Sequence, residues 1–65
     1  LKEQQELIIE SLPGIGPNLA KSLLKYFKSV ENIINSDKES LKKVEKIGYK
    51  KAEAIIKVIK EKYND

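Results

Sequence analysis

The chain has 65 residues, with 13 lysines against 10 acidic residues, a formal net charge of +3, and no cysteine or histidine. This length allows one small domain, and the missing cysteine and histidine exclude disulfides and the usual zinc ligand sets. No apolar run approaches the roughly 18 residues of a membrane span and no secretory signal is visible, so we expect a cytoplasmic protein with no membrane partner.

Helical patterns follow one another from the N-terminus. Residues 2–11 predict a first helix that places Ile8 and Leu12 on its inner side. The next stretch, "LPGIG" at residues 12–16, contains Pro13 followed by Gly14, the pattern of a type II turn, whose second central position needs a positive φ. A second helix is expected to start at Pro17 with Gly16 near its N-cap, because proline is favoured in a first helical turn.

The second half of the chain repeats this organisation after a short connecting element. That element, residues 30–35, has Ser29 as its expected N-cap. Ser36 and Glu39 have capping-box spacing and are expected to open a fourth helix. A last helix is predicted from residue 49 to about residue 63, and no strand pattern is visible. We therefore predict an all-α fold of five helices.

An internal repeat becomes visible when the two halves are aligned at an offset of 32 residues. The unit is a helix, a tight hairpin and a second helix, and its hairpin recurs as "VEKIG" at residues 44–48. The apolar stripe of the helix after each hairpin is reproduced position for position: Ala20, Leu23, Leu24 and Phe27 match Ala52, Ile55, Ile56 and Ile59. Within the hairpins, Gly16 matches Gly48, but Gly14 is replaced by Lys46.

Positive charge gathers around the two hairpins. Residues 12–29 hold three lysines and no acid, and residues 42–51 hold five lysines and one glutamate, whereas the other segments are neutral or acidic. A helix start exposes amides without partners at the positive end of the helix dipole, and small turn residues let an anion come close. We therefore predict phosphate binding at both hairpins, with Lys21, Lys50 and Lys51 adding charge.

A plainer interpretation is that the glycine turns only join helices and that the lysines form a solvated face. The repeat and the charge beside both turns favour phosphate binding, although Lys25 and Lys57 are expected to be merely solvated. Ile15 and Ile47 are expected to point inward and to hold each hairpin in place.

The hairpin sequences also resemble a known family. "LPGIGPNLAKSLL" resembles the helix-hairpin-helix motif and "VEKIGYKKAEAII" is similar to a second copy, so residues 1–65 look like one tandem helix-hairpin-helix domain from a larger protein. The longer stretch resembles the C-terminal domains of XPF/Hef-type structure-specific nucleases, with the UvrC C-terminal domain as a near rival. Glu45, where UvrC-like hairpins often carry proline, favours the XPF/Hef kind.

This resemblance implies sequence-independent binding of forked, junction or double-stranded DNA on the nucleoid, through two hairpins that contact the two phosphate strands across the minor groove. Lys46, which occupies a turn position that suits glycine, leads us to expect main-chain contacts at the first hairpin and more lysine contacts at the second. The implied DNA-binding residues are Gly14, Ile15, Gly16, Asn18 and Lys21 in the first copy, and Lys46, Gly48, Lys50 and Lys51 in the second.

Two other function classes remain open, and a third is disfavoured. The resemblance also implies homodimerisation or pairing with a paralogue, with Ile9, Tyr26, Val58 and Tyr63 as interface candidates. A protein-only scaffold like a SAM-type helical bundle would leave the lysine-flanked hairpins unexplained. An enzyme is disfavoured because no nucleophile has a base partner and no carboxylates are paired, so we expect no catalytic residues, metal, cofactor or small-molecule substrate.

Overall fold

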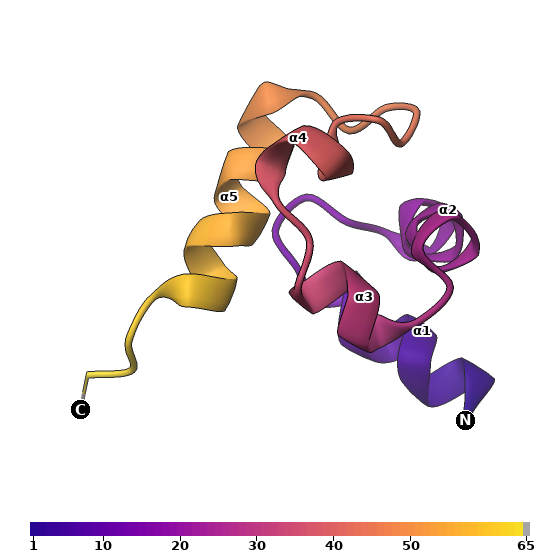
Figure 1. The fold of residues 1–65 in the computed structure, drawn as a ribbon. Helices are drawn as coiled ribbons and strands as arrows, with labels where there is room; N and C mark the ends of the chain where they lie inside the picture. Colours follow the sequence, from indigo (N-terminus) through magenta and orange to yellow (C-terminus); the bar gives the residue numbers. More distant parts are fainter. Residues whose placement is uncertain (65) are drawn as a thin grey trace.

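The computed structural model describes residues 1–64, and all regular structure in that range is helical (Figure 1), which confirms the all-α prediction. In chain order the helices are α1 (Lys2–Glu10), α2 (Pro17–Phe27), α3 (Val30–Ile34), α4 (Lys38–Leu41) and α5 (Tyr49–Lys60).

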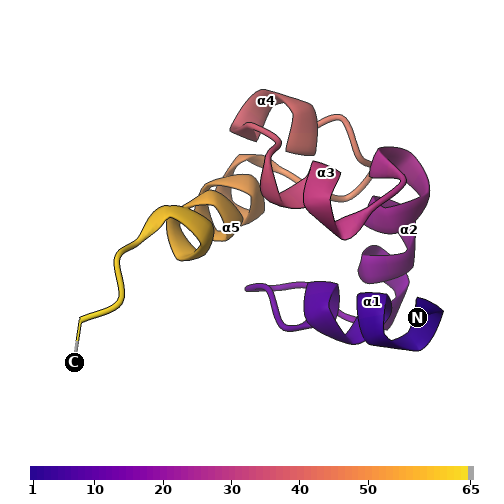
Figure 2. The ribbon, with the colours of Figure 1, turned by 60° about the horizontal axis from the view of Figure 1, so that its bottom comes forward.

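The helices form two units joined by α3. In the first unit α1 packs against α2, and in the second unit α4 packs against α5. The connecting helix α3 lies against both α1 and α2, as Figures 1 and 2 show from two directions. Each unit holds one hairpin between its two helices, residues 12–16 in the first and residues 44–48 in the second.

The buried core reproduces the internal repeat. Of the eleven buried apolar residues in the described part of the chain, only Ile33 on α3 has no buried counterpart 32 positions away. The other ten form five pairs: Ile9 with Leu41, Leu12 with Val44, Ile15 with Ile47, Ala20 with Ala52, and Leu23 with Ile55. The repeat is therefore a repeat of packing positions, and the two units contribute matching layers to one core.

Three predicted details differ from the structure. Ile8 was expected inside, but its side chain is exposed and Ile9 is fully buried instead. The N-cap of α4 is Asp37, whose carboxylate accepts a 2.8 Å hydrogen bond from the amide of Ser40. Ser36, the expected cap, donates its hydroxyl to the carbonyl of Ile33.

The end of α5 is the third difference, because the helix stops at Lys60, three residues before Tyr63.

The expected cap of α3 is confirmed, since the Ser29 hydroxyl accepts a 3.0 Å hydrogen bond from the amide of Asn32. Within residues 1–64, no helix combines the length and apolar composition that crossing a membrane requires.

Candidate nucleic-acid interface

The two hairpins have the same backbone geometry. In the first, the amide of Ile15 donates to the carbonyl of Leu12 at 3.1 Å, and Gly14 has a φ of 73°. In the second, the amide of Ile47 donates to the carbonyl of Val44 at 3.0 Å, and Lys46 has a φ of 72°. The lysine therefore adopts the left-handed conformation of the glycine it replaces, and the turn type does not change.

The helices that follow the hairpins begin without a side-chain cap, unlike the two short helices. Ser29 caps α3 and Asp37 caps α4, whereas no side chain caps α2 or α5. The first intrahelical bonds of α2 and α5 are those of Ala20 to Gly16 and of Ala52 to Gly48. The amides before them, such as those of Asn18 and Lys50, have no intrahelical acceptor and are open to a ligand.

The fold itself does not require glycine at positions 16 and 48. Gly16 has a φ of −99° and Gly48 a φ of −92°, which any residue can adopt. A β-carbon added to either glycine would meet no atom within 4 Å apart from the glycine itself and its two chain neighbours. The space in front of both helix starts is therefore open at the position of a β-carbon.

Gly14 is different, because it is packed against the other unit. A β-carbon on Gly14 would lie 3.4 Å from Cε of Lys51, whose half-buried side chain runs across the first hairpin. Lys51 was assigned to the second hairpin from the sequence, yet the structure places its stem on the first. The two hairpins are therefore neighbours, and this lysine links them.

The other predicted DNA-binding residues fall into two groups. Those on the outside of the hairpins and helix starts are exposed: Asn18, Lys21, Lys46 and Lys50. Ile15 is buried, and its amide is already used in the turn. The prediction that Ile15 contacts a ligand is therefore wrong for its side chain and amide, whereas the expectation that it points inward and holds the hairpin is confirmed.

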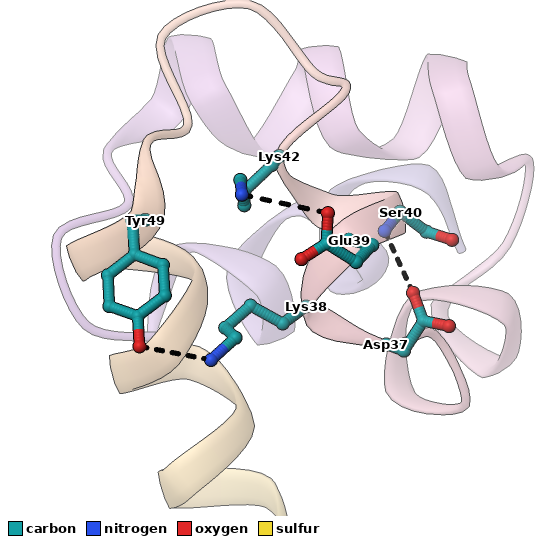
Figure 3. Close-up of polar contacts among 6 residues, drawn as sticks. All are labelled: Asp37, Lys38, Glu39, Ser40, Lys42 and Tyr49. Carbon is teal, nitrogen blue, oxygen red and sulfur yellow. Dashed lines mark hydrogen bonds and ion pairs between the residues drawn. The ribbon is translucent and has the colours of Figure 1, made fainter.

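A cluster around Tyr49 was not predicted from the sequence (Figure 3). The ammonium group of Lys38 lies 4.3 Å from the centre of the Tyr49 ring and 3.3 Å from its hydroxyl oxygen. The same hydroxyl lies 3.3 Å from Oε2 of Glu53. Lys42 approaches the ring at 5.7 Å while it pairs with Glu39 at 3.6 Å, and that ion pair is the only one within residues 1–64.

Hydrogen bonds in this region shift two ionisation equilibria. The hydrogen bond with the Tyr49 hydroxyl raises the pKa of Lys38, so its ammonium group stays charged. The hydrogen bonds from Ser40 lower the pKa of Asp37. The sequence signals for the cluster were modest: Lys38 at the start of α4, Lys42 just after its end, and a tyrosine at the position that matches Pro17.

The two units carry charges of opposite sign at two pairs of equivalent positions. In the first unit Glu6 lies on α1 and Lys21 on α2, and both line the groove between these helices. In the second unit the matching positions are Lys38 on α4 and Glu53 on α5, which likewise line one groove. The acid and the base have changed places between the helices, so each unit keeps one of each.

Three of the four residues proposed for a dimer interface are exposed, and one is buried. Tyr26, Val58 and Tyr63 are on the surface, Tyr63 with 90% of its side chain exposed. Ile9 is 0% exposed and lies in the core, so its assignment to a partner surface is wrong. Leu7 and Ile8 on α1 are also exposed apolar residues; Leu7 was not named from the sequence, and Ile8 was expected inside.

A pair of matched hairpins, each opening an uncapped helix, defines a tandem helix-hairpin-helix domain. The chain belongs to the family described as the SAM-like helix-hairpin-helix tandem, which it matches over residues 5–61. The predicted family resemblance is thereby confirmed.

Relatives and solved structures of this family can be compared with the chain directly. It is 49% identical over 63 residues to a protein of Methanocaldococcus jannaschii that is provisionally named an ATP-dependent RNA helicase, spanning 97% of the chain and 8% of that relative. It is 50% identical over 36 residues to UvrABC system protein C of Thermosipho africanus, covering 55% of the chain and 6% of that relative.

Among solved structures, XPF from Aeropyrum pernix, determined alone and in complex with DNA, is similar at a TM-score of 0.91 and 40% identity. This match covers 97% of the chain and 32% of XPF. The chain thus corresponds to a small part of each relative.

Proposed function

We propose that this domain binds DNA through phosphate contacts that do not read the base sequence, and that it performs no chemistry itself. One observation carries the proposal: both units place a glycine at an uncapped helix start where the fold needs no glycine. A phosphate oxygen fits such a place, because it accepts hydrogen bonds from the open amides and is attracted by the helix dipole. The likeness to an XPF solved with DNA supports the proposal.

In this proposal the two hairpins contact DNA through different groups. At the first hairpin, Gly16 leaves the backbone bare and Gly14 carries no side chain, so main-chain contacts dominate, with Lys21 and Lys51 beside them. At the second hairpin, the side chain of Lys46 stands on the turn and is exposed. It hinders close approach of the backbone but supplies an ammonium group, so Lys46 and Lys50 carry more of the binding there.

The relatives support a role for the domain within a larger protein. The matched regions belong to proteins named as an ATP-dependent RNA helicase, a UvrABC system protein C and an XPF, and the chain covers 8%, 6% and 32% of their lengths. We infer that the domain delivers a nuclease or helicase to forks, junctions or damaged duplex. Within residues 1–64 no three histidine, cysteine or acidic side chains come together to hold a metal ion.

Fluorescence anisotropy of labelled forked, duplex and single-stranded DNA tests this proposal, in salt from about 50 to 200 mM. Gly16→Glu and Gly48→Glu place a negative charge in each open helix start, while Gln4→Glu adds the same charge on the exposed side of α1. We expect wild type and Gln4→Glu to bind with a steep salt dependence. Each hairpin variant should bind weakly, with a salt slope smaller by about 0.9 for every phosphate that a lysine no longer neutralises.

Circular dichroism provides the control for folding of each variant. If folded Gly16→Glu and Gly48→Glu bind every DNA as tightly as Gln4→Glu does, the hairpins are not the phosphate sites and the proposal fails. The two variants also rank the hairpins, because main-chain contacts at the first hairpin predict the larger loss for Gly16→Glu.

Dimerisation is a second candidate function. The observation that favours it is the exposure of apolar side chains at repeat-equivalent positions, Tyr26 on α2 and Val58 on α5. Sedimentation equilibrium of wild type and of a Tyr26→Ser, Val58→Ser double variant tests it. A wild-type dimer that becomes monomeric in the variant would support this role, whereas a monomeric wild type over the micromolar range would remove it.

A further inference from the structure

A groove between the packed helices α1 and α2 gathers lysines from both of them. Its volume is about 420 Å³, and around the half-buried Leu24 it is lined by four exposed lysines, Lys2, Lys21, Lys25 and Lys28. The single ion pair within residues 1–64 lies in the second unit, so none of these four ammonium groups is paired with a carboxylate of the described chain. The groove therefore presents four unneutralised positive charges beside an apolar floor.

The stability of the helices explains only some of these lysines. The helix dipole favours Lys25 and Lys28 at the end of α2, although Lys28 has a φ of 79°, a conformation that costs a lysine more than a glycine. Lys2 is the first residue of α1, at the positive end of its dipole, where a cation is unfavourable. Lys21 lies four residues before Lys25 on the same helix, and like charges at this spacing repel. The fold thus leaves Lys2 and Lys21 unexplained.

The second unit does not repeat these two charges. At the offset of 32 residues, Ile34 takes the place of Lys2 and Glu53 takes the place of Lys21. The two lysines at the end of the second helix recur in both units. The charge that the helix dipole does not explain is therefore special to the first unit, and the repeat does not account for it.

The dimensions and lining of the groove suit an acidic peptide better than a nucleic acid. The axes of packed helices are about 8–10 Å apart, whereas the major groove of a DNA duplex alone is about 12 Å wide, so a duplex can lie over this groove but cannot enter it. A single strand can enter, but no aromatic side chain lines the groove to stack its bases. Glu6 also lines it, and its carboxylate repels a phosphate but can accept a hydrogen bond from a peptide N–H.

We propose that the groove between α1 and α2 binds an acidic segment of a partner protein. Carboxylates of the segment pair with the four lysines, one apolar side chain contacts Leu24, and a main-chain amide donates to Glu6. The lysines of α2 extend over about 10 Å of helix, the length of about three extended residues. This binding needs no DNA, so it can be tested independently of the proposed function.

Fluorescence anisotropy of a labelled acidic peptide tests the proposal. The probe is a peptide of about ten residues with one leucine among glutamates, in about 50 mM salt, where exposed charges are weakly screened. We expect wild type to bind it about tenfold more tightly than the same peptide with glutamine for glutamate, because each exposed ion pair contributes little. Serine in place of the leucine should weaken binding about threefold through the lost contact with Leu24.

The repeat supplies a matched pair of variants. The double variant Lys25→Gln, Lys28→Gln and the double variant Lys57→Gln, Lys60→Gln remove the same charge from equivalent positions. The first should weaken peptide binding about fivefold, and the second should stay within about twofold of wild type. Lys25→Arg, Lys28→Arg should keep the affinity, since the positive charge is retained. Circular dichroism checks that each variant is folded.

Chemical shifts of the backbone amides locate the bound peptide. The changes should gather in residues 2–6 and 21–28 and leave residues 53–60 unaffected. Equal losses of affinity in the two double variants, or equal binding of the glutamate and glutamine peptides, would overturn the proposal, because either result would mean that no specific groove recognises the acidic side chains.

A short DNA strand distinguishes the two kinds of polyanion. If a strand of about six thymines shifts the same groove amides and loses affinity only in Lys25→Gln, Lys28→Gln, the groove is a nucleic-acid site and the peptide assignment fails. If the peptide fills the groove while the strand binds at the hairpins or not at all, the assignment stands.

Discussion

Replacing Gly16 with serine tests whether the open start of α2 is reserved for a ligand. Gly16 already has the extended backbone of an N-cap residue, with φ −99° and ψ −173°, and a β-carbon there meets nothing. A serine hydroxyl can accept a hydrogen bond from an amide of the first turn. Ser29 makes this bond at the start of α3. The variant should therefore cap α2 without disturbing the hairpin.

The expected gain in stability can be estimated from this geometry. Serine is a better N-cap than glycine by a few tenths of a kcal/mol, and restricting the unfolded chain adds to that difference. Together these effects should raise the free energy of unfolding by about 0.5–1 kcal/mol. For a chain of 65 residues the entropy of unfolding is about 0.14 kcal/mol/K, so the melting temperature should rise by about 4–7 °C.

The DNA affinity of Gly16→Ser should change in the opposite direction. The new hydroxyl occupies an amide that a phosphate would otherwise contact, and its β-carbon stands where the phosphate approaches. Thermal melts followed by circular dichroism and anisotropy at low salt measure the two effects on one sample. A more stable variant with unchanged affinity would show that phosphates do not contact this helix start. A less stable variant would refute the capping argument itself.

Three further predictions concern the hairpin turns, the core and the cap of α4. Gly14→Ala should lower the free energy of unfolding by about 1 kcal/mol, and Lys46→Gly should raise it by up to about that amount, because both positions have a positive φ. The urea midpoint should therefore fall in the first variant and rise in the second. The buried counterparts Leu23 and Ile55 should each cost about 2–5 kcal/mol when changed to alanine, and unequal losses in urea melts would argue against matching core layers. Folding lowers the pKa of Asp37 below its usual 3.8. The carboxylate therefore stabilises the fold above that value, and this stabilisation is lost as the pH falls through the folded pKa. Asp37→Asn should remove this acid sensitivity, which urea midpoints at several pH values would reveal.

The hairpins and most of the core were predictable because each depends on residues close in sequence. Pro13 and Gly14 predict their own turn, and the apolar spacing of α2 and α5 predicts the inner faces of these helices. The inner side of α1 was predicted wrongly because Leu7, Ile8 and Ile9 are all apolar, so helical periodicity alone does not choose among them. The repeat contained the answer, since Ile9 is the counterpart of the buried Leu41.

Contacts between elements distant in sequence were not predictable in the same way. The cap of α4 is a local exception: Ser36 and Asp37 are both good N-cap residues, and the sequence pattern does not choose which one reaches the amide of Ser40. The position of Lys51 over Gly14 depends on how the two units pack, which no local pattern encodes. The site around Tyr49 likewise forms only when α4 lies against α5.

The reversed charges of the two units affect whether each helix pairs with its correct partner during folding. Two copies of one packing unit can mispair, with a first helix docking on the second helix of the other copy. Pairing α1 with α5 would bring Glu6 near Glu53, and pairing α4 with α2 would bring Lys38 near Lys21, so each wrong partner meets a like charge. The double variant Lys38→Glu, Glu53→Lys makes the copies alike in charge. It should refold with a larger fraction of helix-swapped oligomers, which size-exclusion chromatography would detect.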